Sequence, residues 1–187
     1  MLTPRLVIVA ACLLPALAAC SSDDDGDPAS AKVGGDLDCT TALTATYPDG
    51  TTVDLDGGTA AVRLGDGSGY TVYAGDYELP TAGIGTATLR PPAGDHLASI
   101  FIAPVNQGQA VPIDPGTEVK AGNPEGSLAL GVILYSGKTG TGTATGVSGT
   151  ATFEGVDAER LCLSIDYRDD ATSLTGTVAA DVYDSPF

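Results

Sequence analysis

The sequence predicts an all-β fold, an antiparallel β-sandwich of about seven to ten strands that spans residues 37–187. Threonine and valine, which favour strands, are frequent, and 25 glycines together with many aspartates supply turns. Short segments alternate apolar and polar residues with a period of two, as half-buried strands do. Turn residues recur roughly every eight to twelve positions, a spacing typical of sandwiches, and no long helical period is present.

The first predicted strand covers residues 37–47, where apolar side chains recur at every second position. The triplet Pro48-Asp49-Gly50 then predicts a turn, because proline presets one turn position and glycine accepts a positive φ at another. The same reasoning predicts strands over residues 51–56, 59–64 and 70–74, separated by glycine-rich turns.

The middle of the chain contains one strongly apolar segment and one long irregular one. Residues 86–90 form a short predicted strand that Pro91 and Pro92 end, since proline cannot donate to a ladder. Residues 97–103 are almost continuously apolar and predict a buried central strand. Residues 104–126 carry four prolines, and so long a loop in a compact domain either contains a short strand, over 110–113 or 117–120, or serves function.

The last third reads as a series of strands. Residues 127–136 have the strongest strand pattern in the chain, and residues 139–147 largely alternate threonine with glycine, which predicts a weak, twisted strand. Strands over 148–154, 160–167 and 173–183 follow, and the last two predict an antiparallel hairpin.

The first nineteen residues predict a secretory signal peptide. Arg5 is the only charge before Asp23, and the apolar run that follows it is broken by Pro15. A transmembrane helix needs about 20 apolar residues, so this shorter run is typical of an export signal and not of a permanent span. The run ends in small residues, Leu17-Ala18-Ala19, directly before Cys20.

The segment Leu17-Ala18-Ala19-Cys20 resembles the lipobox of bacterial lipoproteins. The resemblance implies cleavage before Cys20 and attachment of a diacylglyceryl group, with fatty acids such as palmitate, to its thiol. The protein would then be anchored on the extracytoplasmic side of the cell membrane or outer membrane, because two or three acyl chains hold a protein stably. In a two-membrane host, Ser21 favours the outer one. Residues 20–36, rich in aspartate, predict a flexible acidic tether.

The formal charge of −16 narrows the classes of partner. Nucleic acid is itself anionic, so we expect no nucleic-acid partner. Binding of the protein surface to anionic lipid head groups is unfavourable for the same reason. The expected contacts are the membrane, through the lipid alone, and an envelope protein or glycan.

Cys39 and Cys162 are the two thiols that remain once Cys12 leaves with the signal and Cys20 is acylated. In an exported domain they predict one disulfide, worth roughly 4–5 kcal/mol in the chain-entropy model. The strand pattern, however, places Cys39 on the apolar face of its strand and Cys162 on the polar face of its own. A bond between them therefore requires a strand edge or a bulge, and the pairing stays open at this point.

No catalytic motif is present, so we predict that the chain is not an enzyme. His96, the only histidine, precedes an apolar strand and is most simply a solvated loop residue. Acidic residues that are neighbours in the sequence are weak candidates for a calcium site, because calcium prefers hard oxygen ligands. They also suggest an alternative, an envelope hydrolase that uses paired carboxylates. Such a hydrolase would need a cleft and a carboxyl of raised pKa. The calcium candidates are Asp54, Asp56, Asp169 and Asp170.

The later strands show a second similarity. Pro115-Gly116-Thr117, residues 148–153 and residues 175–178 together resemble β-sandwich domains of uncharacterised bacterial lipoproteins. This resemblance implies a fold and brings no catalytic residues with it. The function expected from the sequence is an anchored binding or structural module of the envelope, non-catalytic, with the paired-acid hydrolase and a calcium-stabilised spacer or adhesion domain as alternatives.

Overall fold

The structure is a computed structural model that describes residues 31–33, 37–65, 67–84, 89–106, 110–122, 126–141 and 147–185. The predicted signal peptide, the predicted lipidation site Cys20 and most of the predicted tether lie outside the described residues.

The described residues contain strands and no helix, which confirms the all-β class. The thirteen strands exceed the predicted number because several of them are only three residues long. They are β1 (Ala31–Val33), β2 (Leu37–Cys39), β3 (Ala42–Thr46), β4 (Thr52–Asp54), β5 (Gly58–Arg63), β6 (Tyr70–Gly75), β7 (His96–Pro104), β8 (Glu118–Lys120), β9 (Leu128–Ser136), β10 (Thr139–Thr141), β11 (Ser148–Val156), β12 (Arg160–Arg168) and β13 (Ser173–Asp184).

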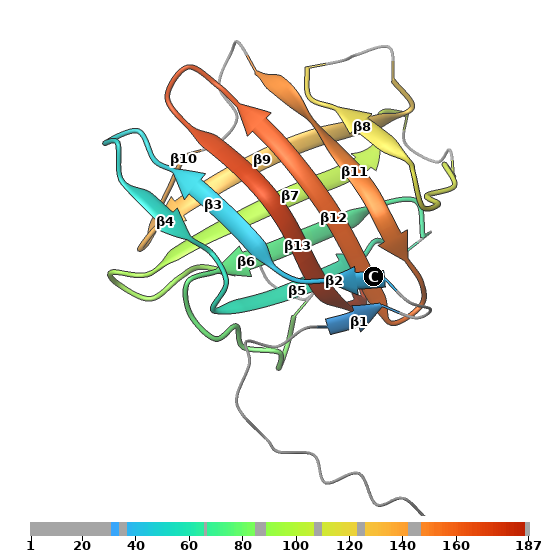
Figure 1. The fold of residues 1–187 in the computed structure, drawn as a ribbon, viewed down its shortest axis with the longest axis horizontal. Helices are drawn as coiled ribbons and strands as arrows, with labels where there is room; N and C mark the ends of the chain where they lie inside the picture. Colours follow the sequence, from blue (N-terminus) through green and yellow to red (C-terminus); the bar gives the residue numbers. More distant parts are fainter. Residues whose placement is uncertain are drawn as a thin grey trace, which may run out of the picture.

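Eleven of these strands form a single curled sheet in the order β10-β9-β7-β6-β5-β13-β12-β11-β8, with β3 paired to β13 and β4 paired to β3. The curl produces two layers, in which β3, β13, β12 and β11 cross over β5, β6, β7 and β9 (Figure 1). An isolated parallel bridge between Ala121 and Leu130 links the end of β8 back to β9. A separate hairpin pairs β1 with β2, with Ala31 opposite Cys39.

Strand β13 connects the two layers. It pairs with β12 along residues 173–181, while its other edge pairs first with β3 and then, over residues 182–184, with β5. The pairing with β5 is parallel, so the sheet is mixed and departs here from the antiparallel arrangement that we predicted. Ala179 lies between the part of β13 that pairs with β3 and the part that pairs with β5. On this edge its main-chain groups hydrogen-bond to side-chain hydroxyls and not to a strand. Thr41 Oγ1 accepts a hydrogen bond from the Ala179 amide (3.1 Å), and Thr59 Oγ1 donates one to the Ala179 carbonyl (2.6 Å). A buried amide needs a partner, so these threonines allow β13 to change neighbours.

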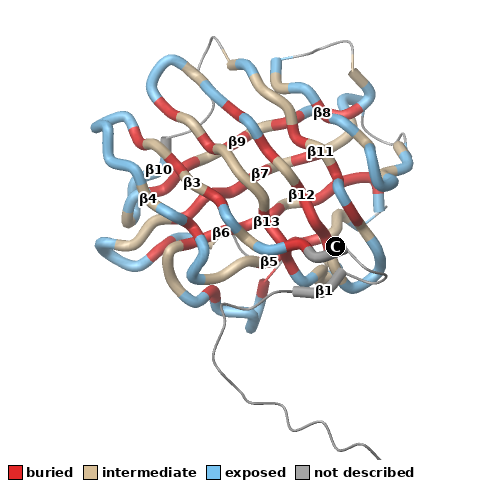
Figure 2. The backbone as a smooth tube through the Cα atoms, viewed as in Figure 1, coloured by how far each residue is buried: buried red, intermediate tan, exposed pale blue. Residues whose placement is uncertain are grey.

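Buried residues lie along the middle of the crossing strands (Figure 2), and the apolar ones form two large clusters and one small cluster. The main cluster lies between the layers and includes Phe153, Tyr167 and Ile100. A second cluster covers the outer side of β5, β6, β7 and β9. There Leu79 and Ile84, from the segment between β6 and β7, pack with Tyr73 and Leu97. Strand β7 is therefore buried on both faces, as its continuous apolar sequence predicted.

The structure decides one open alternative and leaves one predicted strand unconfirmed. The long segment 104–126 does contain a strand, β8, and it is the candidate at 117–120 and not the one at 110–113. The strand predicted over 86–90 is not confirmed, because Leu89 and Arg90 are irregular and residues 85–88 lie outside the described residues.

Candidate functional site

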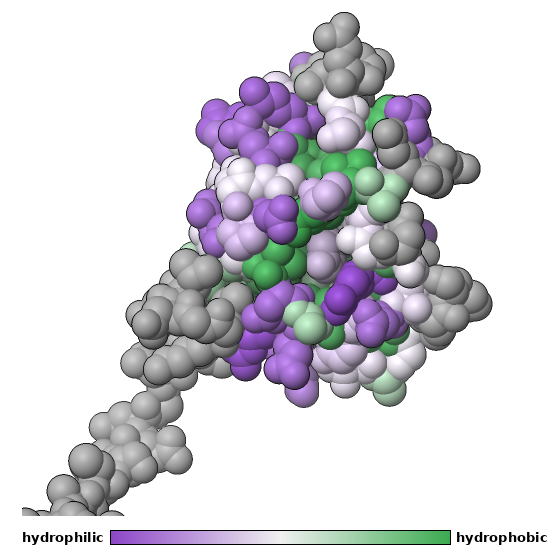
Figure 3. Space-filling view, turned by 90° about the vertical axis from the view of Figure 1, so that its right-hand side faces the viewer, coloured by the Kyte–Doolittle hydropathy of each residue, from purple (hydrophilic) through white to green (hydrophobic). Residues whose placement is uncertain are grey.

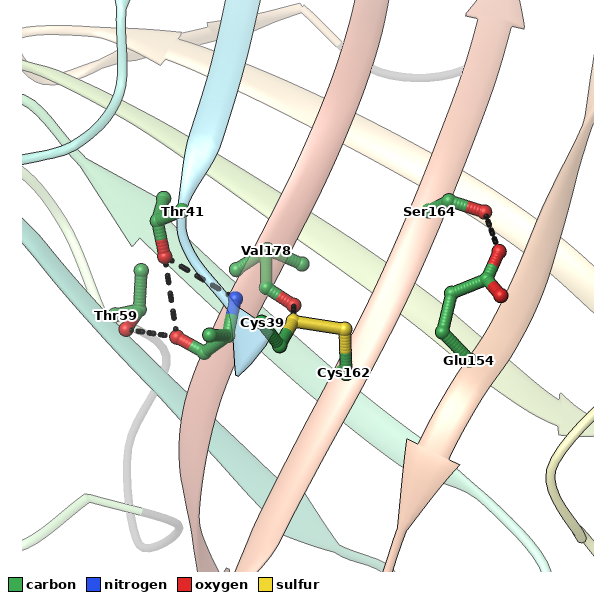
Figure 4. The surroundings of a disulfide bond; sticks show 8 residues. Cys39, Thr41, Thr59, Glu154, Cys162, Ser164 and Val178 are labelled. Atoms are coloured by element: carbon green, nitrogen blue, oxygen red, sulfur yellow. Dashed lines mark hydrogen bonds between the residues drawn. A yellow bond between two sulfur atoms is a disulfide. The ribbon is translucent and has the colours of Figure 1, made fainter. Parts of the chain in front are cut away.

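The predicted disulfide is present. Cys39 and Cys162 are joined with a Cα–Cα distance of 6.1 Å across a sequence separation of 123 residues (Figure 4). Both cysteines are buried with Ala179 in a small cluster apart from the two larger ones. The bond therefore fastens the β1–β2 hairpin to the outer face of β12 and β13.

The conflict between the faces of the two cysteines is resolved by a break in the first predicted strand. The chain forms β2 up to Cys39, is irregular at residues 40–41, and resumes as β3 at Ala42. Leu43 then points into the main core, whereas Cys39 lies on the outer face beside Cys162. Period-two alternation does not continue through an irregular residue pair, so sequence alone assigned Cys39 to the wrong face.

A groove of about 370 Å³ lies beside β8. Its walls are residues 111–112, residues 117–120 and residues 126–128. All of these residues except Ser127 and Leu128 belong to segment 104–126, which the sequence predicted to contain a short strand or to serve function. Figure 3, which turns the right-hand side of Figure 1 toward the viewer, shows hydrophobic side chains between hydrophilic ones on the side where β8 lies.

The rim of the groove joins apolar and charged chemistry. Val111 packs against the main core and Leu128 is buried in it, while Glu118 and Lys120 are exposed and form an ion pair (3.2 Å). The amide of Ala121 and the carbonyl of Thr117 hydrogen-bond to β11, so in the antiparallel pattern the main-chain groups of Glu118 and Lys120 point away from β11. The groove thus offers an apolar floor with polar groups at its edge.

The calcium candidates are not gathered into one site. Asp54 accepts a hydrogen bond from the Thr44 hydroxyl (2.8 Å), and Asp169 accepts one from the main-chain amide of Thr172 (2.6 Å). In the part of the chain that the structure describes, no group of three or more His, Cys, Asp or Glu side chains is placed to hold a metal ion.

Among the described residues, two carboxyls have a displaced pKa, and both are displaced downward. Hydrogen bonds from Thr51 lower the pKa of Asp49. Burial alone would raise the pKa of Asp169, but hydrogen bonds from Ala171 and Thr172 outweigh it and lower the pKa. Neither group supplies the raised pKa that the paired-acid hydrolase hypothesis requires.

His96 is not the solvated loop residue that the sequence predicted. It begins β7, its side chain is only 18% exposed, and its Nδ1 lies 2.8 Å from Oδ2 of Asp76. The other carboxylate oxygen of Asp76 accepts the His96 main-chain amide (2.7 Å), and the ring of Tyr47 lies against the imidazole with centroids 4.9 Å apart. Sequence reasoning missed this pair because twenty residues separate the two partners and no spacing rule joins them.

No family model matches this chain, and neither a curated protein nor a solved structure shows a significant match to it. In the residues that the structure describes, we find no helix with the length and apolar character required to cross a membrane.

Proposed function

We propose that this chain is an exported protein that a lipid on Cys20 anchors to the extracytoplasmic side of the cell membrane or outer membrane. The support comes from the lipobox-like segment Leu17-Ala18-Ala19-Cys20 and from the Cys39–Cys162 bond, since disulfides persist in oxidising compartments.

We further propose that the β domain binds an envelope protein or glycan through the groove beside β8. The groove is the single observation that carries this proposal, because its 370 Å³ lies within the range of about 300–1,000 Å³ that is common for ligand sites. A binding role needs a shaped surface with a few polar groups. The exposed Glu118–Lys120 pair beside buried Leu128 supplies both.

The anchor is tested by replacing Cys20 with serine in the full chain and separating membranes from soluble material. We expect C20S to leave the membrane fraction, because serine offers no thiol for the thioether. The matched control is C12S, which changes a cysteine within the apolar run and leaves the acceptor in place. Unchanged membrane retention of C20S would contradict the anchor.

The groove is tested by thermal unfolding of the full chain with envelope glycans, peptidoglycan fragments and calcium. A ligand that binds only the folded state stabilises it by about 2.7 kcal/mol at a hundredfold excess over Kd. We expect a shift with one glycan or peptide class that Ser127→Trp abolishes by filling the groove. Thr52→Trp, at an exposed position of β4, is the control and should retain the shift. A shift that survives Ser127→Trp would place binding elsewhere, and a calcium shift would support the metal alternative.

A further inference from the structure

Three chemically distinct side chains line up across the sheet at the far end of β9 from the groove. His96 is the register partner of Ser136 on β9, and the ladder between β6 and β7 places Asp76 opposite His96, where the Asp76 amide donates to the His96 carbonyl (3.2 Å). Side chains two residues apart in a strand point to the same face. The residues two positions from Asp76, His96 and Ser136 are Ala74, Ala98 and Leu134, and all three belong to the main cluster. Asp76, His96 and Ser136 therefore share the face turned toward that cluster. The order across the strands is carboxylate, imidazole, hydroxyl.

The aspartate fixes the histidine in one orientation. Asp76 takes the main-chain amide of His96 on one oxygen (2.7 Å) and holds Nδ1 with the other (2.8 Å). The Tyr47 ring supports the imidazole from the opposite layer, and the Tyr47 hydroxyl donates to the Tyr135 carbonyl (3.3 Å). Among the described residues no group hydrogen-bonds to Nε2. The imidazole therefore has a proton-accepting nitrogen on the side opposite its carboxylate partner.

The register places Ser136 on the strand next to the imidazole, although among the described residues no hydrogen bond joins its hydroxyl to Nε2. The amide of Val105 donates to the carbonyl of Ser127 (3.0 Å), so odd-numbered residues of β7 form the hydrogen-bonded pairs with β9. His96 and Ser136 are then a non-hydrogen-bonded pair, in which Cα atoms lie about 4.5 Å apart and the side chains stand side by side. Ser136 is exposed to solvent, so a substrate has access to it.

We propose that Asp76, His96 and Ser136 form a hydrolytic site in which Ser136 is the nucleophile, His96 the general base and Asp76 the residue that positions the imidazole. This site is separate from the proposed binding groove and does not depend on it, since Leu128 and Ser136 are at opposite ends of β9.

The chemistry uses only these groups, the substrate and water. Ser136 Oγ bonds to the carbonyl carbon of an ester while its proton passes to His96 Nε2. The tetrahedral intermediate collapses, the bond from the carbonyl carbon to the alcohol oxygen breaks, and the imidazolium returns its proton to the leaving alcohol. Water, deprotonated by His96, then attacks the acyl-serine and releases the acid and free Ser136. Asp76 retains its negative charge throughout and stabilises the imidazolium.

The charge of the chain narrows the substrate class. The formal net charge is −16, and the groups around His96 include Asp76, Asp95 and Asp49, with the phenol of Tyr47. An anionic substrate is repelled from such a surface, whereas a neutral or cationic ester is not.

The test is covalent labelling of the full chain with a fluorophosphonate, which forms a bond from Ser136 Oγ to phosphorus and releases fluoride. Peptide mass spectrometry locates the adduct, and hydrolysis of p-nitrophenyl acetate gives a second readout. We expect the adduct at Ser136, labelling at least about 100-fold slower in His96→Gln, and labelling about 10- to 100-fold slower in Asp76→Asn. The pH profile of labelling should change in His96→Gln, a readout that a purely structural role would not affect.

The control is Ser164→Ala, because Ser164 donates to Glu154 (2.7 Å) without an imidazole beside it. Circular dichroism checks that each variant is folded, and if His96→Gln unfolds, Ser136→Ala must still abolish both labelling and ester hydrolysis. Labelling no greater at Ser136 than at Ser164, or labelling unchanged in a folded His96→Gln, would overturn the proposal.

Discussion

The hydroxyl of Thr41 accepts a hydrogen bond from the main-chain amide of Ala179 (3.1 Å) and donates one to its carbonyl (3.2 Å). One side chain thus takes the place of a paired strand where β13 leaves β3 and has not yet reached β5 (Figure 4). Both layers of the domain depend on this point, because β13 belongs to each of them.

Replacing Thr41 with valine keeps the shape of the side chain and removes its hydroxyl. The Ala179 amide then loses its partner, and a buried unsatisfied group costs about 1–3 kcal/mol. We expect the free energy of unfolding to fall by that amount in urea denaturation. Thr46→Val is the control, since Thr46 contacts Thr52 in an exposed pair, and it should change stability by less than about 0.5 kcal/mol. Equal effects of the two variants would show that Ala179 does not need the hydroxyl.

Loss of the Cys39–Cys162 bond should destabilise the domain but leave its core folded. The bond closes a long loop, and its removal is expected to lower the free energy of unfolding by about 2–5 kcal/mol. Both cysteines lie outside the two large apolar clusters, so the paired variant Cys39→Ala with Cys162→Ala should keep a cooperative transition. Calorimetry under oxidising conditions checks the shift. A broad, non-cooperative transition would show that the bond is needed for the core itself.

Gly176 occupies a position that only glycine fits. Its φ is +129°, and an added Cβ would overlap the carbonyl oxygen of Ala42 on β3. Strain and displacement of β3 together predict that Gly176→Ala lowers stability by about 2–5 kcal/mol. Gly50, with φ +82° and open space around a built Cβ, separates the two effects. Gly50→Ala should cost only the backbone strain of about 1–2 kcal/mol, so comparable losses from both would argue against the overlap.

Asp169 makes the free energy of unfolding depend on pH in the acidic range. Its carboxylate accepts the amides of Ala171 (2.8 Å) and Thr172 (2.6 Å), and these bonds hold its pKa below the ordinary 3.8 in the folded chain. The Asp169 carboxylate is therefore protonated more readily in the unfolded chain than in the folded one. Its contribution to the free energy of unfolding is present above about pH 4 and is lost as the pH falls through the pKa of the folded chain.

We therefore expect the stability difference between the unchanged chain and Asp169→Ala to shrink as the pH is lowered below 4. Urea denaturation at a series of pH values measures this difference. Asp170→Ala removes the neighbouring charge but no hydrogen bond to the turn, and its effect should stay nearly constant. A pH-independent effect of Asp169→Ala would contradict the linkage.

Local patterns in the chain were enough to predict several elements. The apolar segment 97–103 became the doubly buried β7, residues 127–136 became β9, and the Pro48-Asp49-Gly50 turn separates β3 from β4. Each of these depends on residues within one strand or turn, where a period of two or a positive φ is set by the nearest neighbours. The all-β class followed from the same kind of information, whereas the strand pattern left the pairing of Cys39 with Cys162 open.

The arrangement of the strands relative to one another depended on contacts between distant parts of the chain. No local pattern states that β13 runs parallel to β5, that Cys39 turns to the outer face after a break at residues 40–41, or that Asp76 and His96 meet. Alternation specifies which side chains share a face within a strand, but partner and register are selected by the sum of burial and hydrogen bonding over the whole sheet. The groove beside β8 and the row from Asp76 to Ser136 arise only at that level, because each joins residues from strands that the sequence keeps apart.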